Sequence, residues 1–323
     1  MAMLRLICAT AALLSVVSAT SLPARAETKL TVSSANLSLG HMVQRLAQSK
    51  GYFAAEGIKT EVFDFKGGGP AIQALVGGGA DMCMCTGDHV IWLANNGIRT
   101  RVLVAVTLFN SYGLVARANS PYTDLRSLKG QRIGITSSGS STDNMIRFAV
   151  RKLGLNADRD YVLIGTGTSA AMEPAIETGA VAAGMLTTPD FQSFLYRGKG
   201  RYRLVENFSV LPYVTSSYIV TDAWLRKNPE VARGVARAAV RALELIHTDH
   251  EAVRADLAKT YPQFDQAFVE QIVKETQAKL SKDGRLNESS WQSVNDIITS
   301  FDPKVKPVPY SEAAALEFLP TAK

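Results

Sequence analysis

The period of hydrophobic and polar positions changes repeatedly along the chain. Short apolar runs, typical of buried strands, alternate with stretches in which apolar residues recur every three or four positions, as on one face of a helix. Up to residue 107 this pattern predicts strands at 30–34, 60–65, 81–85 and 101–107. Helices are expected at 39–50, between the glycines of 67–69 and 77–79, and at 88–95. This alternation is typical of a largely parallel sheet with helices on both faces.

A second series of the same kind begins after Tyr112. It predicts strands at 132–136, 161–165, 180–185 and 216–220, and helices at 124–128, from the Ser/Gly-rich turn to 153, at 170–178 and at 190–196. Asn228-Pro229-Glu230 then starts a long helix, and the remainder is mostly helical. Two α/β units predict an α/β fold of two lobes, each a mostly parallel sheet flanked by helices, rather than one continuous sheet.

The first 26 residues have the pattern of a secretory leader. Arg5 precedes a mostly apolar run, Leu6–Val17, and Ala24-Arg25-Ala26 is a small-x-small cleavage signal. The run is too short for an ordinary transmembrane helix. We therefore expect residues 1–26 to be a cleaved signal peptide and the mature protein to be periplasmic; a buried N-terminal helix is the alternative.

Composition narrows the class of protein. The 323 residues are 46% hydrophobic and 20% charged, which excludes a disordered chain, a collagen-like repeat or a disulfide scaffold. The net charge is +6, and it becomes +4 without the leader, which holds two basic residues and no acid. Because the basic residues are scattered rather than gathered in a stripe, no nucleic-acid partner is expected.

Cys83 and Cys85 lie two residues apart in the predicted strand 81–85. Side chains at positions i and i+2 of a strand share a face, and so close a pair makes a strained disulfide. No second CxC or CxxC pair is present to complete a zinc site. Both cysteines are therefore interpreted as small buried apolar residues, with a redox or metal role as the alternative.

Five strand-to-helix loops are rich in Ser, Thr, Gly or Asn: residues 34–40, 66–70, 86–89, 137–143 and 187–190. In α/β sheets, ligands bind beyond the carboxyl ends of the strands, where free amides at helix starts suit an anionic oxygen. Ser137–Thr142, with five hydroxyls and one glycine, is the strongest candidate. Plain helix capping is the alternative for any single loop.

Three aspartates follow the hydroxyl residues of these loops, namely Asp88, Asp143 and Asp190. We expect them to complement helix dipoles and to point away from a cleft, although bonding to a ligand's hydroxyl or amine groups is an alternative. His41, at the start of a helix, is expected to face the cleft, with a structural hydrogen-bonding role as the alternative. His89 could act as a base, but no partner nucleophile can be named.

The sequence lacks common enzyme signatures. GxGxxG, GxxxxGK[ST], GxSxG and HExxH are all missing. No enzymatic activity, cofactor or metal site is therefore expected. Aromatic residues near the lobe junction, Tyr112 among them, could form a pocket wall or belong to the core.

Several segments together carry a resemblance to a known family. Ala47–Ile58 resembles the A-x-x-K-G-Y-F-x-x-E-G-[IL] signature of periplasmic solute-binding proteins of ABC importers. The subgroup is the one that includes taurine-, alkanesulfonate-, nitrate- and thiamine-pyrimidine-binding proteins. Further similar elements are Ala74–Asp81, Leu125–Gly134 and Asn228–Val231. The resemblance extends over nearly the whole chain after the leader, and the order of the motifs is more specific than any single motif.

The resemblance implies a Venus-flytrap (type II periplasmic binding protein) fold that closes over one small ligand. Lobe 1 would comprise residues 27–112 plus 216–323 and lobe 2 residues 113–215, with crossings near 110–115 and 212–218. Together with the loops, it predicts a ligand site formed by Asn36, Leu37, Ser38, His41, Gly68, Gly69, Thr86, Gly87, Asp88, Tyr112, Ser137, Ser138, Gly139, Ser140, Ser141, Thr142, Thr188, Pro189 and Asp190.

The resemblance also implies a function. The chain would capture a small organic solute (a sulfonate, a carboxylate or a polar ring compound) and deliver it, as a monomer, to an ABC permease. Lys66 is the one Lys or Arg in the matched loops, so an oxyanion held by a guanidinium is not expected. The alternatives are a pyrimidine-synthase-like enzyme, which uses this fold and consumes an active-site His, and a ligand-sensing subunit of a membrane receptor.

Overall fold

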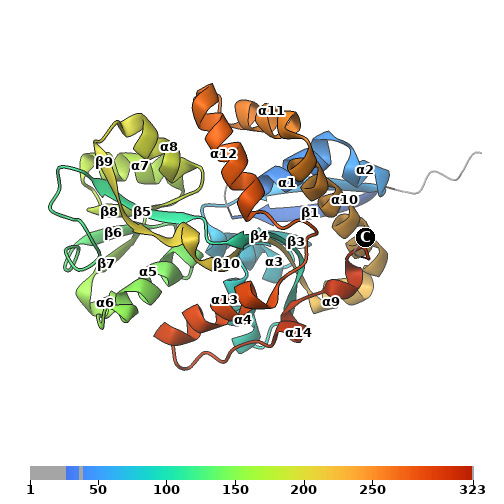
Figure 1. The fold of residues 1–323 in the computed structure, drawn as a ribbon. Coiled ribbons are helices and arrows are strands. Elements are labelled where there is room, and N and C mark those ends of the chain that lie inside the picture. Colours follow the sequence, from blue (N-terminus) through green and yellow to red (C-terminus); the bar gives the residue numbers. More distant parts are fainter. Residues whose placement is uncertain (1–26, 36–38, 322–323) are drawn as a thin grey trace, which may run out of the picture.

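The computed structural model describes residues 27–35 and 39–321, so the predicted leader lies outside the described residues. Within those ranges, ten strands form two five-stranded sheets, one in each of two lobes (Figure 1). The strands are β1 (Thr28–Ser34), β2 (Ile58–Asp64), β3 (Met82–Cys85), β4 (Thr100–Phe109), β5 (Tyr112–Arg117), β6 (Arg132–Ile135), β7 (Val162–Gly165), β8 (Ala183–Thr187), β9 (Tyr202–Asn207) and β10 (Pro212–Thr221).

Each sheet is mostly parallel and contains one antiparallel strand. The order in the first sheet is β2-β1-β3-β10-β4, with β1 parallel to β2 and β3, and β10 antiparallel to both of its neighbours. The order in the second sheet is β7-β6-β8-β5-β9, with β5 antiparallel to β8 and β9. The carboxyl ends of the parallel strands therefore lie at one edge of each sheet.

Helices cover both faces of each sheet (Figure 1). Among the described residues, none of these helices is long and apolar enough to cross a membrane. The helices are α1 (His41–Ser49), α2 (Tyr52–Ala55), α3 (Gly68–Val76), α4 (Asp88–Asn95), α5 (Ser141–Lys152), α6 (Ala157–Asp160), α7 (Ser169–Thr178), α8 (Asp190–Gly198), α9 (Asp222–Lys227), α10 (Pro229–Thr248), α11 (His250–Thr260), α12 (Gln266–Lys279), α13 (Glu288–Phe301) and α14 (Tyr310–Ala313), with short 3-10 turns at Phe208–Val210 and Leu316–Phe318.

The apolar core continues from one lobe into the other. One cluster packs α1, α10, α11 and α12 on the first sheet, and a smaller one packs α7 and α8 on the second. A third cluster joins Ile72 of α3 and Trp291 of α13, in the first lobe, to Ile135 of β6 and Ile146 of α5, in the second. The lobes are thus connected through apolar packing at α5 and α13, as well as through the chain.

The chain passes between the sheets twice. It leaves the first sheet after Phe109 and enters the second at Tyr112, and it returns between Asn207 and Pro212. The two passages lie side by side, because the Asn110 amide donates to the Leu211 carbonyl at 2.8 Å. The exact division of the chain between two lobes stays a prediction.

Most predicted elements are present, with shifts of a few residues at their ends. The helix predicted at 124–128 is wrong, because this segment forms hydrogen-bonded turns in which Ser127 and Asp124 bond to each other. The strands β5 and β9 were not predicted. Both pair antiparallel in the second sheet, and that pairing depends on contacts between segments about 90 residues apart in the chain.

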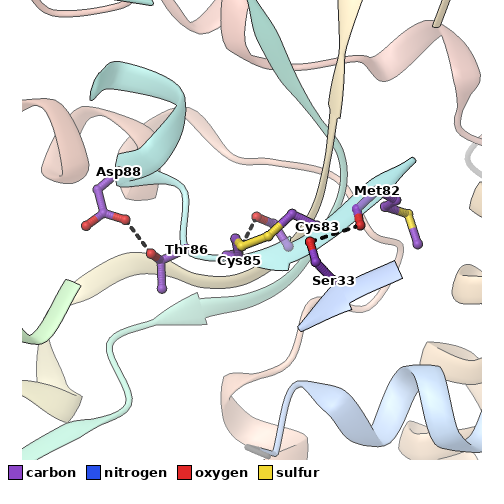
Figure 2. Close-up of a disulfide and its surroundings, with 7 residues drawn as sticks. Ser33, Met82, Cys83, Cys85, Thr86 and Asp88 are labelled. Atoms are coloured by element: carbon purple, nitrogen blue, oxygen red, sulfur yellow. Dashed lines mark hydrogen bonds between the residues drawn. A yellow bond between two sulfur atoms is a disulfide. The ribbon is translucent and has the colours of Figure 1, made fainter. Parts of the chain in front are cut away.

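The interpretation of Cys83 and Cys85 as unpaired residues is wrong, because the structure joins them in a disulfide (Figure 2). Both are buried in β3, with a Cα–Cα distance of 5.3 Å. The physical reason is the strand geometry itself, which points both thiols to the same face. Cys85 directly precedes Thr86, so the disulfide lies at the edge of the candidate site.

Candidate ligand-binding cleft

A narrow cavity of about 30 Å³ lies between the two lobes, beyond the carboxyl ends of the parallel strands. Residues of both lobes and of the two passages between them form its wall: Ala35, His41, Gly67, Gly68, Met84, Thr86, Ser111, Tyr112, Thr136, Ser140, Ser141, Thr187 and Thr215. The first residues of α1, α3 and α5 are among them, so helix amides and their partial positive charge face this space. Among the residues that the structure describes, none that lines this cavity is a Lys, an Arg or an acid.

Two glycines allow the helices of the first lobe to approach the cavity closely. A Cβ on Gly68, the first residue of α3, would lie 2.5 Å from Nε2 of His89. A Cβ on Gly40, which precedes α1, would lie 2.3 Å from Cβ of Ser216 on β10. Gly68 is therefore required for packing against His89, whether or not its amide also contacts a solute.

The hydroxyls of the second lobe mostly bond to one another. Thr136, Ser140 and Thr142 form a triangle of hydroxyl–hydroxyl hydrogen bonds of 2.8 to 2.9 Å. The Thr142 hydroxyl also accepts the Thr136 amide at 2.9 Å. Gly139, with φ of +70°, donates its amide to Asp143 at 2.8 Å. These bonds hold the loop in shape and leave the hydroxyls of Thr136, Ser140 and Thr142 little free capacity.

Asp88 is fully buried at the junction of the lobes. Its Oδ1 accepts the Thr86 hydroxyl (Figure 2). Its Oδ2 accepts the side-chain amide of Asn144, on α5 of the other lobe, at 2.6 Å. Its carboxylate therefore bridges from one lobe to the other behind the wall of the narrow cavity, which Asp88 does not line.

Two buried histidines of the first lobe are uncharged at neutral pH. Burial, with a smaller contribution from the charge of Arg45, lowers the pKa of His41 to about 3. Burial also lowers the pKa of His89, although the charge of Asp88 opposes that effect. Neither imidazole therefore supplies a positive charge to the cleft.

Two tyrosines beside the cavity also experience the charge of Asp88. Burial and then Asp88 raise the pKa of Tyr112, while a hydrogen bond with Ser141 opposes the rise. The pKa of Tyr213 is raised well above its usual range by the same two causes. Both phenols stay protonated, and of the two only Tyr112 is among the lining residues of the cavity. Tyr112, which could have been pocket or core, lies at the cavity.

Two larger cavities flank the narrow one. A cavity of about 530 Å³ lies between α3 and α4 of the first lobe and α5 of the second, and includes Gly69, Ser138 and Gly139 in its lining. The other, of about 580 Å³, lies between the end of α11 and the start of α8, with Asp190 and Lys66 among its lining residues. Burial raises the pKa of Asp190 to about 6.

The structure distributes the predicted residues over these three spaces. Those lining the narrow cavity are His41, Gly68, Thr86, Tyr112, Ser140 and Ser141. Those lying beside or behind the cavity walls are Gly87, Asp88, Ser137, Thr142, Thr188 and Pro189. The Gly87 amide is already used by the Val214 carbonyl, at 2.7 Å. Asn36, Leu37 and Ser38 lie outside the described residues.

Sequence reasoning missed part of the wall. Ser111 belongs to the first passage between the lobes and Thr215 to β10, just after the second. Both lie in the crossings predicted near 110–115 and 212–218, which had not been assigned to the site. The Ser111 carbonyl accepts the Thr188 amide at 2.6 Å and its hydroxyl lies 3.3 Å from that of Thr187. The passage thus positions the loop before α8. The position of both residues in the predicted crossings was the available signal.

Buried polar atoms without a partner gather near the passages. Within residues 27–35 and 39–321, Nδ2 of Asn110 and Oγ of Ser216 have no hydrogen-bond partner, and both residues are almost completely buried. Such groups usually bond to water or a ligand. No group of three or more His, Cys, Asp or Glu in the described part of the chain is placed to hold a metal ion.

Residues 39–252 match the NMT1/THI5-like family. The chain belongs to this family. One relative of this chain is YtlA of Bacillus subtilis (strain 168), which is described as a putative binding protein. The two sequences are 24% identical over 88% of this chain and 87% of YtlA. The riboflavin-binding protein RibY of Chloroflexus aurantiacus is 28% identical over 61% of this chain and 56% of its own.

An enzyme is also related to this NMT1/THI5-like chain. The 4-amino-5-hydroxymethyl-2-methylpyrimidine phosphate synthase of Aspergillus parasiticus is 24% identical over 79% of this chain and 77% of its own.

Solved structures confirm the two-lobed fold of periplasmic binding proteins. A protein of Bordetella bronchiseptica RB50 superposes with a TM-score of 0.79 at 25% identity, covering 90% of this chain and 95% of its own. The alkanesulfonate-binding protein SsuA from Xanthomonas axonopodis pv. citri, solved with MOPS, superposes with a TM-score of 0.72 at 17% identity. It covers 90% of this chain and 99% of its own. The predicted family and fold class are thus confirmed.

Proposed function

We propose that this protein is the exported solute-binding component of an ABC importer. It would capture a small organic solute between its lobes, which correspond to residues 27–112 plus 216–323 and residues 113–215. Relatives named as binding proteins and the shared fold support this role.

The observation that carries the proposal is the narrow cavity lined by both lobes. Its volume of about 30 Å³ is far below the roughly 300–1,000 Å³ of pockets that hold organic solutes. A solute can therefore enter only if the lobes move apart. Contacts from both lobes then exist only in the closed state, so a bound solute shifts the population toward closure.

The two sides of the lobe junction differ in a way that suits a hinge. On one side, α13 of the first lobe packs against α5 of the second through apolar residues such as Trp291 and Ile146 (Figure 1). Separating this side would expose apolar surface at about 25 cal/mol per Å². It therefore acts as the fixed side of the hinge.

The other side is polar and partly exposed. Tyr196 of α8 donates to Asp265, at the start of α12, at 2.8 Å, and Gln192 donates to Glu275 of α12 at 2.9 Å. Water can replace these hydrogen bonds at small net cost. The lobes would therefore open between α8 and α12, and we call these contacts the clasp.

The protein would bind its solute without transforming it. The related synthase keeps catalysis as an alternative, with His41 as the residue consumed. Burial of the neutral His41 ring favours a wall residue over a reacting group. The same proposal includes three further points about the protein. It is periplasmic, in keeping with the predicted leader; it is a monomer; and it delivers its solute to a membrane permease.

Native mass spectrometry combined with small-angle X-ray scattering tests the proposal. The mature protein should carry a co-purifying small molecule of unchanged mass. Removing it by partial unfolding should increase the radius of gyration, and adding it back should reverse the change. A product formed on incubation, or a changed mass of the peptide containing His41, would contradict a binding role.

A further inference from the structure

The cavity of about 580 Å³ between the end of α11 and the start of α8 lies next to the narrow cavity, and we call it the outer cavity. The end of β2 and the turn after α11 line it from the first lobe, and the first residues of α7 and α8 line it from the second. Its volume lies within the roughly 300–1,000 Å³ of pockets that hold organic solutes. The outer cavity therefore has room for a part of a solute that the narrow cavity cannot contain.

The two cavities are neighbours along the same cleft. In the first lobe Lys66 lines the outer cavity, and the next residue, Gly67, lines the narrow one. In the second lobe Thr187 lines the narrow cavity, and Asp190 lines the outer one. Asp190 also begins α8, the helix that carries the clasp, so the outer cavity lies on the side where the lobes would separate. A solute that enters between the parted lobes can therefore extend from one cavity into the other.

Asp190 is the acid of the outer cavity that lacks a countercharge. Glu173, which lines the same cavity, accepts Arg197 at 3.0 Å. The charges of Asp64 and Lys66 are exposed to water, which screens them. Within residues 27–35 and 39–321 no cationic side chain forms an ion pair with Asp190, and burial raises its pKa to about 6. At neutral pH Asp190 therefore carries a charge that no ion pair neutralises.

Tyr261 lines the outer cavity from the first lobe. It is 6% exposed, and its hydroxyl oxygen has no hydrogen-bond partner among the described residues. Burial and then the charge of Asp190 raise the pKa of Tyr261, so the phenol stays protonated within range of that charge. One hydrogen bond of the Asp190 carboxyl group is with Ser169, on its own lobe, and a carboxylate can accept about four. Polar groups left in this way usually bond to water or to a ligand.

A protonated amine suits these two side chains better than an anion does. An ammonium group has three N–H donors and no acceptor, so it can donate to the Asp190 carboxylate and to the Tyr261 oxygen together. Its bond to the carboxylate joins two charged groups and is roughly twice as strong as a bond between neutral groups. An anion would be repelled by Asp190, and Arg197, which could offset that repulsion, is already bound to Glu173.

We propose that the outer cavity binds a protonated aliphatic amine of the solute, and that Asp190 of the second lobe and Tyr261 of the first select this group. The inference rests on the proposed function and names the class of solute within it: a compound that carries an amine and extends toward the narrow cavity. Closure brings the two side chains onto the amine from opposite lobes. The amine therefore stabilises the closed form.

Two series of probes, each with an amine, an alcohol and a carboxylate of similar size, provide the test. Thermal shift and titration calorimetry would compare putrescine with 1,4-butanediol and succinate, and benzylamine with benzyl alcohol and benzoate. Wild-type protein should bind at least one amine at least tenfold more tightly than the alcohol and the carboxylate of its series. Asp190→Asn should weaken that amine at least tenfold and leave the alcohol unchanged, and Tyr261→Phe should weaken the amine two- to tenfold.

Glu206→Gln is the matched control. Glu206 is also a half-buried acid of the second lobe whose pKa burial raises, and the substitution changes the net charge equally. It lines neither the outer cavity nor the other two cavities of the cleft. This variant should keep the wild-type preference for the amine. Equal loss of the preference in Glu206→Gln and Asp190→Asn would show that net charge sets it, and would overturn the inference.

The outcomes separate the inference from the proposed function. Tighter binding of an alcohol or a carboxylate than of its matched amine, or a co-purifying solute without a basic nitrogen, would overturn the role of Asp190 and leave the binding function intact. Binding of no probe would overturn the inference, and the absence of any co-purifying solute as well would contradict both. An unchanged amine affinity in Tyr261→Phe would overturn the binding of the amine from both lobes. The wild-type comparison decides even if Asp190→Asn does not fold.

Discussion

Acidification should destabilise this protein through His41. The unfolded chain takes up a proton on this residue near pH 6.5, whereas burial delays protonation in the folded state to about pH 3. Between these values the unfolded state binds more protons, so the free energy of unfolding falls as the pH falls. The stabilisation is fully present above pH 6.5.

The structure sets the size of the effect. Each pH unit below 6.5 costs about 1.4 kcal/mol until the folded pKa is approached. Between pH 6.5 and pH 5 the loss from His41 is therefore about 2 kcal/mol, a large part of the 5–15 kcal/mol that stabilises a typical protein. Since His41 lines the cavity, opening the lobes would rehydrate it, and acid should favour the open form as well.

Urea unfolding of the wild-type protein and of His41→Asn at half-unit steps from pH 7.5 to pH 4.5 measures this. The variant cannot protonate at that position, so its stability should decline by about 2 kcal/mol less than that of the wild type between pH 6.5 and pH 5. Parallel curves for the two proteins would refute the reasoning, because they would show that His41 titrates alike in both states.

Three further predictions concern the cleft. Burial raises the pKa of Asp190 to about 6, so its folded form holds a proton more tightly than the unfolded chain, and its stabilisation is lost as the pH rises from about 4 through 6. Asp190→Asn should therefore be about 2–3 kcal/mol more stable than wild type at pH 7.5 and equal to it at pH 3.5, by urea unfolding. Tyr196→Phe removes the exposed hydrogen bond to Asp265 and should shift the population toward the open form, which scattering without solute would detect as a larger radius of gyration; an unchanged radius contradicts the clasp. Gly68→Ala should cost about 1–3 kcal/mol, because the new Cβ would lie 2.5 Å from His89, and full stability would show that this ring can move.

Several elements of the fold could be predicted because they depend on local patterns. The strand at 81–85 is a continuous apolar run, and α10 begins at Pro229 with a face of apolar residues at helical spacing. The strands β5 and β9 could not be located in this way. Their residues pair across the second sheet with partners distant in the chain, and their own patterns carry no equally strong signal.

The sequence predicted which loops form the candidate site, but not which hydrogen bonds their side chains make. The hydroxyl-rich sequence at 137–142 suggested direct ligand contacts, whereas in the structure Ser140 and Thr142 mainly bond to each other and to Thr136. Asp88 was expected to complement a helix dipole, and the sequence did not predict that its carboxylate also accepts the amide of Asn144 from the other lobe. Residue types indicate which side chains can form hydrogen bonds, but not which partner each side chain bonds to in the folded protein.

The sequence by itself determined the α/β class, the strand-to-helix loops and the family, because periodicity, capping residues and ordered motifs are local properties of the chain. Only the tertiary structure decided that Cys83 and Cys85 form a disulfide, that the cavity is about 30 Å³, and that α5 and α13 share one apolar core. The cavity and the shared core depend on distances between segments brought together by folding, whereas the disulfide depends on the local geometry of β3. The same holds for the charge at the cleft: the desolvation that keeps His41 neutral exists only because the folded chain buries this residue.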